Sequence, residues 1–396
     1  MQTIPNPRDN LPEPDDRSDA HSRLVADHIR AAIEQAGGSI SFAEYMQLAL
    51  YAPGLGYYNA GATKLGAAGD FVTAPEISSI FGRVLARQCA FVLEQLDKGQ
   101  VFEPGAGTGA LAVSMLGKLD ELGALPERYL ILEVSADLRE RQEARIRQEC
   151  PQHLDRVEWV TGMPARFTGV VVANEVLDAI PVERFRIQGD DVMQARVGVD
   201  GRNFAWRYEK SPASLARSVR EIESDIGYPL ADGYESEVSP GVVNWVSDLS
   251  NAVHEGVVLL VDYGVSRREY YAPERGQGWL RCHFRHHAHN DPLILPGIQD
   301  LTSWVDFSAV AAAASTAGLN IAGYVTQAQL LMNGGLEEEL GDFLSLPVAE
   351  QVKLSGQVKI LTLPTEMGEN FKCMGLARGD VQPPPAFSGT DRAHSL

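Results

Sequence analysis

A short glycine-rich stretch carries the clearest chemistry in the sequence. It reads Glu-Pro-Gly-Ala-Gly-Thr-Gly over residues 103–109, after the apolar pair Val101-Phe102 and before a helix-like run that starts at Ala110. Glycine has no Cβ, so its backbone can adopt turns closed to other residues and can lie against a ligand. A helix that begins after such a turn presents unpaired N–H groups to that ligand. The stretch therefore predicts a cofactor-binding turn between a strand and a helix.

Three classes of ligand are bound by turns of this kind. A phosphate-binding P-loop would need Gly-Lys-Ser/Thr at its end, and no lysine follows Gly109. A dinucleotide fold has the spacing G-x-G-x-x-G, whereas these glycines are spaced G-x-G-x-G. The third class is S-adenosylmethionine (SAM), whose methyltransferase fingerprint is similar to E-x-G-x-G-x-G. The positions that match it are Glu103, Gly105, Gly107 and Gly109.

Two acids support SAM as the cofactor. The carboxylate of Glu103 would favour the positive sulfonium and ammonium groups of SAM and would repel a pyrophosphate. The apolar run 129–132 predicts the next strand, and Glu133 follows it at about the spacing of a ribose-hydroxyl acceptor. We therefore expect Glu103, the three glycines and Glu133 to bind SAM. A chance glycine-rich turn ahead of a surface helix is the alternative.

A second constellation follows the apolar run 170–173, at the carboxyl end of the predicted fourth strand, where ligands of open α/β sheets collect. It contains Asn174, Glu175 and Asp178. On a helical turn, Glu175 and Asp178 would share a face, and two adjacent carboxylates favour a cation between them. A guanidinium is planar and suits bidentate carboxylate binding. These three residues are therefore predicted to be catalytic in methyl transfer to an arginine; acids that merely offset a helix dipole are the alternative.

Two other polar groups carry weaker signals. Residues 262–264, Asp-Tyr-Gly, close the predicted fifth strand at the same rim, although taken alone they favour an ordinary turn. His283, His286, His287 and His289 stand close together, but no carboxylate pattern completes a metal-ligand set. We expect no metal here and interpret the histidines as part of a polar loop around a substrate groove.

The elements around these motifs alternate between strand and helix. Strands are predicted at 101–103, 129–133, 157–160, 170–173 and 257–262, with helices between them, notably 135–149. Apolar runs such as 170–173 suit strands buried on both faces of a parallel sheet. The pattern predicts a doubly wound α/β fold of the class I SAM-dependent methyltransferase (Rossmann-like) type, with a helical N-terminal extension and inserted antiparallel strands and helices. Outside the core, helices are expected at 21–37, 41–50, 75–96, 305–317, 327–333 and 336–344, with a closing strand at 371–376.

We therefore expect a five-part organisation. Residues 1–20 and 380–396 are predicted to be disordered tails, because they are polar and rich in proline or aspartate. The remaining parts are an N-terminal helical segment with a lid loop at 21–98, a SAM-binding core at 99–265 with an antiparallel insertion at about 181–235, and a substrate-side insertion with the C-terminal part at 266–379.

Composition narrows the range of partners. The chain has 396 residues and a formal net charge of −19, which argues against nucleic acid and would attract a basic peptide. The four cysteines form no C-x-x-C, so neither a zinc ribbon nor a redox pair is indicated. No apolar run approaches the length of a membrane span, so no membrane insertion is expected. The N-terminus is typical of neither a signal peptide nor a transit peptide, and we expect a cytoplasmic protein.

With both constellations placed, the chain resembles the MidA-type SAM-dependent methyltransferases, the family of the mitochondrial complex I assembly factor that methylates an arginine. The resemblance implies SAM as cofactor and a protein substrate with an exposed arginine, such as a respiratory complex I subunit. It also implies that Asp70 and Phe71 lie near the methyl donor. The segments that carry it are 69–77, 103–109, 133–135, 174–182, 262–264, 300–302, 305–307 and 367–371.

The sequence leaves two other functions open. One is a non-catalytic assembly factor that binds a respiratory subunit and retains a SAM pocket. The other is a small-molecule O- or N-methyltransferase. The fingerprint also departs from the family, since Thr108 stands where arginine is common.

Overall fold

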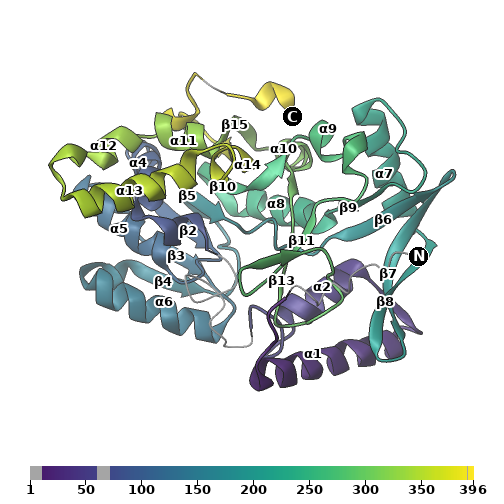
Figure 1. The fold of residues 1–396 in the computed structure, drawn as a ribbon. Helices are drawn as coiled ribbons and strands as arrows, with labels where there is room; N and C mark the ends of the chain where they lie inside the picture. Colours follow the sequence, from purple (N-terminus) through teal and green to yellow (C-terminus); the bar gives the residue numbers. More distant parts are fainter. Residues whose placement is uncertain (1–10, 60–71, 390) are drawn as a thin grey trace. The chain divides into compact units, whose positions relative to one another are not determined.

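The computed structural model describes residues 11–59, 72–389 and 391–396 (Figure 1). The chain folds into two compact units, each assembled from separate stretches of sequence. Unit 1 comprises Met1–Phe71, Asp178–Val242 and Arg267–Trp304, and unit 2 comprises Val72–Leu177, Val243–Ser266 and Val305–Leu396.

Unit 2 is built around a sheet of eight strands. Five neighbouring strands run parallel, in the order β10-β5-β2-β3-β4. Beyond β10 the sheet continues antiparallel through β16 and β15, and the short β14 pairs with the end of β10. The strands are β2 (Gln100–Pro104), β3 (Tyr129–Leu132), β4 (Val157–Val160), β5 (Phe167–Asn174), β10 (Val253–Val265), β14 (Val305–Asp306), β15 (Asn320–Thr326) and β16 (Phe371–Arg378).

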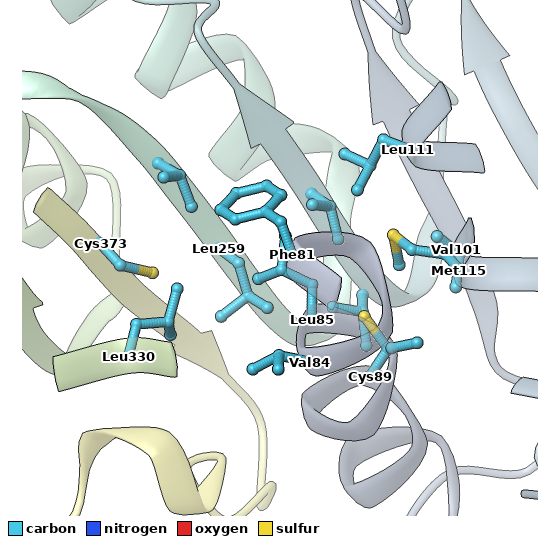
Figure 2. Close-up of a cluster of buried hydrophobic side chains, with 14 of the residues drawn as sticks. Phe81, Val84, Leu85, Cys89, Val101, Leu111, Met115, Leu259, Leu330 and Cys373 are labelled. Atoms are coloured by element: carbon cyan, nitrogen blue, oxygen red, sulfur yellow. The ribbon is translucent and has the colours of Figure 1, made fainter. Parts of the chain in front are cut away.

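Helices supply much of the core of unit 2. Figure 2 shows Phe81 and Leu85 of α4 in one apolar cluster with Leu259 of β10 and Met115 of α5, and all four side chains are buried. This packing holds the strands whose carboxyl ends carry the candidate site. The helices are α3 (Ala74–Ile77), α4 (Ser79–Leu93), α5 (Ala110–Glu121), α6 (Ala136–Glu149), α10 (Phe307–Thr316), α11 (Gln327–Asn333), α12 (Leu336–Leu340), α13 (Val348–Thr362) and α14 (Met367–Asn370).

Unit 1 contains two antiparallel sheets. One has the order β1-β7-β6-β9 with β8 on β7, and the other has the order β12-β11-β13. Its elements are α1 (Asp16–Gln35), β1 (Ser39–Ser41), α2 (Phe42–Tyr51), β6 (Glu183–Gln188), β7 (Asp191–Asp200), β8 (Asn203–Lys210), α7 (Ala213–Ile226), β9 (Glu235–Val238), α9 (Arg267–Tyr270), β11 (Leu280–Phe284), β12 (His287–His289) and β13 (Asp300–Ser303). The remaining helix, α8 (Pro240–Ala252), begins in unit 1 and continues into unit 2.

All five predicted core strands are present, and so are the antiparallel strands after residue 181. The helix expected at 75–96 is interrupted, because Ser78 is extended (φ −155°, ψ 137°) and its side chain caps α4. The helix expected over 336–344 ends at Leu340, where Gly341 has a φ of +50°. The region 267–300 includes α9 and the paired strands β11 and β12.

The two segments expected to be disordered tails contain ordered parts. Helix α1 begins at Asp16, where the Asp15 side chain accepts a hydrogen bond from the Ser18 N–H. Ala386 and Phe387 are buried against the core of unit 2. In the described chain, no helix combines the length and the apolar sequence that a membrane crossing requires.

Candidate functional site

The glycine turn links β2 to α5 in unit 2. Gly105, Gly107 and Gly109 have φ values of +69°, +54° and +83°, a region that residues with a Cβ rarely adopt. A Cβ at Gly105 would also lie 3.4 Å from Cγ2 of Val176. The three positions therefore need glycine for backbone conformation, and the turn brings the start of α5, with its unpaired N–H groups, to the carboxyl edge of the sheet.

The first acid of the fingerprint points into the protein. Glu103 is 2 % exposed, and the Tyr129 hydroxyl donates to its Oε2 over 2.6 Å. Burial raises the pKa of Glu103 to about 7, and the hydrogen bond from Tyr129 opposes that rise. Glu103 thus joins β2 to β3 beneath the turn.

Glu133 lies beside the same turn, in a network centred on Gln142 of α6. The Glu133 carboxylate accepts from the Ser135 N–H over 2.8 Å and from Nε2 of Gln142 over 2.9 Å. The same nitrogen donates to the Gly107 carbonyl over 2.9 Å, and Trp159 Nε1 donates to Oε1 of Gln142 over 2.9 Å. Burial raises the pKa of Glu133 despite these hydrogen bonds. Glu133 and the turn are therefore held by one amide, a role of Gln142 that the sequence did not predict.

Thr108 is tied to α3 and α6. Its hydroxyl donates to Glu76, and Nη1 of Arg145 lies 2.7 Å from both the Thr108 hydroxyl and a carboxylate oxygen of Glu76. Arg145 therefore contacts position 108, where the family fingerprint commonly has arginine and this chain has threonine. No local sequence pattern indicates this contact, because the three residues are far apart along the chain.

The second constellation is not helical. Residues 175–180 form bends and turns after β5, so the expectation that Glu175 and Asp178 share a helical face is wrong. Glu175 has a φ of +53°, and its N–H donates to the Val261 carbonyl of β10 over 2.9 Å. Pro181 also disfavours a helical conformation at Ile180. The hydrogen bonding between β5 and β10 thus continues to Glu175, after which the chain turns sharply.

Asn174 and Glu175 lie together at the end of β5. Nδ2 of Asn174 lies 3.1 Å from Oε1 of Glu175. Oδ1 of Asn174 is buried and accepts no hydrogen bond from the described residues. A left-handed conformation at a non-glycine residue is strained, and such strain concentrates at functional sites.

Asp262, at the end of β10, fixes this bend. It is 1 % exposed, and its carboxylate accepts from the N–H groups of Leu177 over 2.8 Å and Tyr263 over 2.9 Å. The sequence placed Asp262 at the correct rim, but its hydrogen bonds show that it holds the bend after β5.

The other residues singled out in the sequence are not all found with Asn174 and Glu175. Asp178 belongs to unit 1, where it is buried and its carbonyl accepts from the Ser303 N–H over 2.9 Å. Asp70 and Phe71 lie outside the described residues. His287 and His289 are on β12, opposite Phe284 and Cys282 of β11. Among the described residues, no group of three or more His, Cys, Asp or Glu could hold a metal ion.

Comparison with known proteins places this geometry in context. Residues 84–325 match the family model described as "Putative S-adenosyl-L-methionine-dependent methyltransferase". A solved structure from Burkholderia thailandensis with S-adenosyl-homocysteine bound has a TM-score of 0.92 and 37% identity, covering 98% of this chain and 100% of that chain. A native structure of a protein from the same organism has a TM-score of 0.89 at 37% identity, with the same coverage. The methyltransferase fold predicted from the sequence is therefore confirmed.

Curated relatives extend the similarity to animals. The Danio rerio protein named "Protein arginine methyltransferase NDUFAF7, mitochondrial" is 30% identical over 90% of this chain and 87% of its own length. The Homo sapiens protein of the same name is 29% identical, over 86% of this chain and 80% of its own length. These relatives are mitochondrial, so the expectation of a cytoplasmic protein is contradicted.

Proposed function

Because the chain belongs to the family of SAM-dependent methyltransferases, we propose that it methylates an arginine side chain of a protein. The name of the curated relatives supports this choice of acceptor. The structural observation that carries the proposal is that Val176 lies close to the glycine turn, since a Cβ built at Gly105 would be 3.4 Å from Cγ2 of Val176. Glu175, whose backbone has a φ of +53°, directly precedes Val176, so the proposed acceptor residue is next in the chain to a neighbour of the turn expected to hold the methyl donor.

The turn and its supports form the proposed cofactor site. We expect a ligand to lie over the backbone of the left-handed glycines and Glu133, which is held by Gln142, to accept hydrogen bonds from its ribose hydroxyls. Glu103 is buried against Tyr129, so its proposed contribution is to support the turn rather than to touch the cofactor directly. Asp70 and Phe71 remain proposed neighbours of the methyl donor. SAM supplies an electrophilic methyl group, and its transfer to a guanidinium nitrogen leaves S-adenosyl-homocysteine and releases one proton.

Asn174 and Glu175 form the proposed acceptor site in unit 2. A guanidinium offers several N–H donors, whereas Oδ1 of Asn174 and the Glu175 carboxylate are acceptors. A carboxylate on one side of the guanidinium would hold the positive charge on the nitrogens that it contacts and leave the nitrogen facing the methyl group more nucleophilic. Asp178 remains a proposed catalytic residue on the basis of the sequence alone.

A subunit of respiratory complex I is the proposed protein acceptor, on the basis of the family resemblance. The acidic chain, with a net charge of −19, would attract a basic segment that carries the target arginine. We propose that residues 99–265, with an insertion at about 181–235, form the SAM-binding core that also carries Asn174 and Glu175, and that 266–379 holds a substrate-side insertion and the C-terminal part.

The experiment that tests this function uses methyl-labelled SAM with a mitochondrial extract. A methyltransferase labels one or few protein bands, and the label is lost in the Gly107→Val variant. A non-catalytic binding factor would retain a respiratory subunit in a pull-down but incorporate no label. Label in small molecules alone would reject a protein acceptor.

A further inference from the structure

Helix α6 contacts the glycine turn through two side chains that are one helical turn apart. Gln142 donates to the Gly107 carbonyl over 2.9 Å, and Nη1 of Arg145 donates to the Thr108 hydroxyl over 2.7 Å. Residues three apart share a face of a helix, so one face of α6 contacts two consecutive residues of the turn. Gln142 holds the backbone of the turn, and Arg145 holds the side chain that lies between Gly107 and Gly109.

The position of α6 depends strongly on these polar contacts. The buried residues of this helix are Gln142 and Ile146, and of the two only Ile146 is apolar. A surface helix normally packs on its domain through an apolar stripe of about three or four residues in every two turns. Because α6 buries so little apolar surface, its polar contacts with the turn set where the helix lies.

Arg145 also compensates the charge of Glu76 on α3. Its Nη1 lies 2.7 Å from Oε1 of Glu76, and the Thr108 hydroxyl donates to the same oxygen. The side chains of Glu76 and Arg145 are 18% and 29% exposed. An ion pair that is buried to this extent is screened less by solvent than an exposed pair. Loss of the guanidinium would therefore leave the carboxylate of Glu76 beside Thr108 without this counter-charge.

The hydrogen bonds of the Thr108 hydroxyl matter for the start of α5. A threonine at the start of a helix can use its hydroxyl to accept from the first N–H groups of that helix. The Thr108 hydroxyl is instead bonded to Glu76 and Arg145. Gly109, the N-cap residue of α5, has no side chain that could cap the helix. The first N–H groups of α5 can therefore serve a ligand that lies on the turn.

We infer that Arg145 is a positioning residue of the cofactor site. It holds Thr108 and Glu76 so that the glycine turn and the start of α5 keep the geometry that binds SAM, and the inference rests on the cofactor site proposed above. The effect of Arg145 passes through Thr108, so it is assigned no contact with SAM itself. Glu149 of the same helix accepts from Nε of Arg145 over 3.0 Å and thereby orients the guanidinium.

Isothermal titration of the full chain with SAM tests this role without an acceptor protein, so a failure of the proposed arginine methylation would not alter the result. Arg145→Met removes the charge and should weaken SAM binding about 10-fold, the effect of losing a hydrogen bond from a charged group. Arg147→Met is the matched control, because Arg147 pairs with Glu143 of the same helix over 2.6 Å and is 62% exposed. This control should bind SAM like the wild type. Equal SAM affinities for Arg145→Met and Arg147→Met would overturn the inference.

Two further variants separate positioning from a general loss of stability. In Arg145→Lys, one ammonium can replace the single Nη1 that contacts both Thr108 and Glu76, so SAM affinity should return to within about 3-fold of the wild type. Thr108→Val removes the hydroxyl through which Arg145 acts, so the double variant Thr108→Val/Arg145→Met should bind SAM about as weakly as the weaker single variant. An Arg145→Lys variant as weak as Arg145→Met, or additive losses of affinity in the double variant, would refute the positioning role.

Discussion

Nε2 of Gln142 lies 2.9 Å from the carboxylate of Glu133, and the same nitrogen lies 2.9 Å from the Gly107 carbonyl. One side chain of α6 therefore fixes the proposed ribose acceptor relative to the glycine turn. We predict that Gln142→Ala weakens SAM binding about 5- to 10-fold, the effect of losing hydrogen bonds of about 1 kcal/mol that hold the site in place. Isothermal titration measures this, with Gln148→Ala, an exposed residue of the same helix, as the control. Equal affinities for the two variants would show that Gln142 does not organise the site.

The left-handed glycines give a second prediction. Gly107→Ala should strain the turn by about 1 kcal/mol and weaken SAM binding, because alanine disfavours a φ of +54°. Gly117→Ala is the matched control, since it lies within α5, where a Cβ would meet nothing within 4 Å. Helix propensity predicts that this control is stabilised by up to about 1 kcal/mol and binds SAM normally. Unchanged SAM affinity in Gly107→Ala would argue against a ligand on this turn.

The raised pKa of Glu103 leads to a specific prediction for how stability depends on pH. Its pKa is raised from 4.5 to about 7 in the folded protein, so between these values the folded state holds a proton that the unfolded state has lost. The contribution of Glu103 to the free energy of unfolding should therefore fall by about 3 kcal/mol as the pH rises from 4.5 to 7, and stay level above 7.

Urea denaturation of the wild type and Glu103→Gln from pH 4.5 to 8 isolates this contribution, because glutamine does not titrate. The difference in unfolding free energy should shift in favour of Glu103→Gln as the pH rises. Tyr129→Phe removes the hydrogen bond that lowers the pKa of Glu103. In this variant the fall in unfolding free energy with rising pH should therefore continue to a higher pH than in the wild type. Parallel curves for wild type and Glu103→Gln would contradict a buried Glu103 that titrates near neutral pH.

Local sequence signals predicted the parallel core well and the bends around it poorly. The strand at 157–160 and the helix at 327–333 have the predicted boundaries, since hydrophobic period and caps are local. The bend after Asn174 depends on hydrogen bonds to Val261 and Asp262, both more than 80 residues away, so spacing alone suggested a helical turn. The apolar sequence of α13 lacked the one-sided period that identifies a surface helix. The supports from Gln142 and Arg145 are likewise tertiary contacts, which no local pattern indicates.

Glu339 provides a test of the scaffold in unit 2. Its side chain is fully buried and contacts Arg83 and Arg87 of α4 and Lys118 of α5. Burial raises its pKa, but the hydrogen bonds from these cations outweigh that effect and lower it overall. Glu339→Gln should cost about 2 kcal/mol because it removes a buried carboxylate shared by three cations, of which Lys118 is 9% exposed and Arg83 and Arg87 are partly exposed. The exposed neighbour Glu338→Gln should change stability by less than about 0.5 kcal/mol. Chemical denaturation at pH 7 measures both, and similar midpoints for the two variants would contradict a structural role for this cluster.

Two substitutions of Glu175 separate the role of its carboxylate in methyl transfer from the effect of its strained backbone on stability. Glu175→Gly relieves the left-handed strain and should stabilise the fold by about 1 kcal/mol, while it removes the proposed acceptor carboxylate. Glu175→Gln retains the shape and removes the charge. Both variants should bind SAM like the wild type and lose at least about 100-fold in methyl transfer, the size of effect expected for an electrostatic group at a reacting centre. Transfer that survives in both variants would remove Glu175 from the mechanism.

The most direct measurement is mass spectrometry of the protein labelled by the wild-type enzyme and methyl-labelled SAM. We predict that the label lies on an arginine guanidinium, as methylarginine, and that it is lost in Glu175→Gln. A label on another type of side chain, or no transfer by wild-type protein that binds SAM, would contradict it.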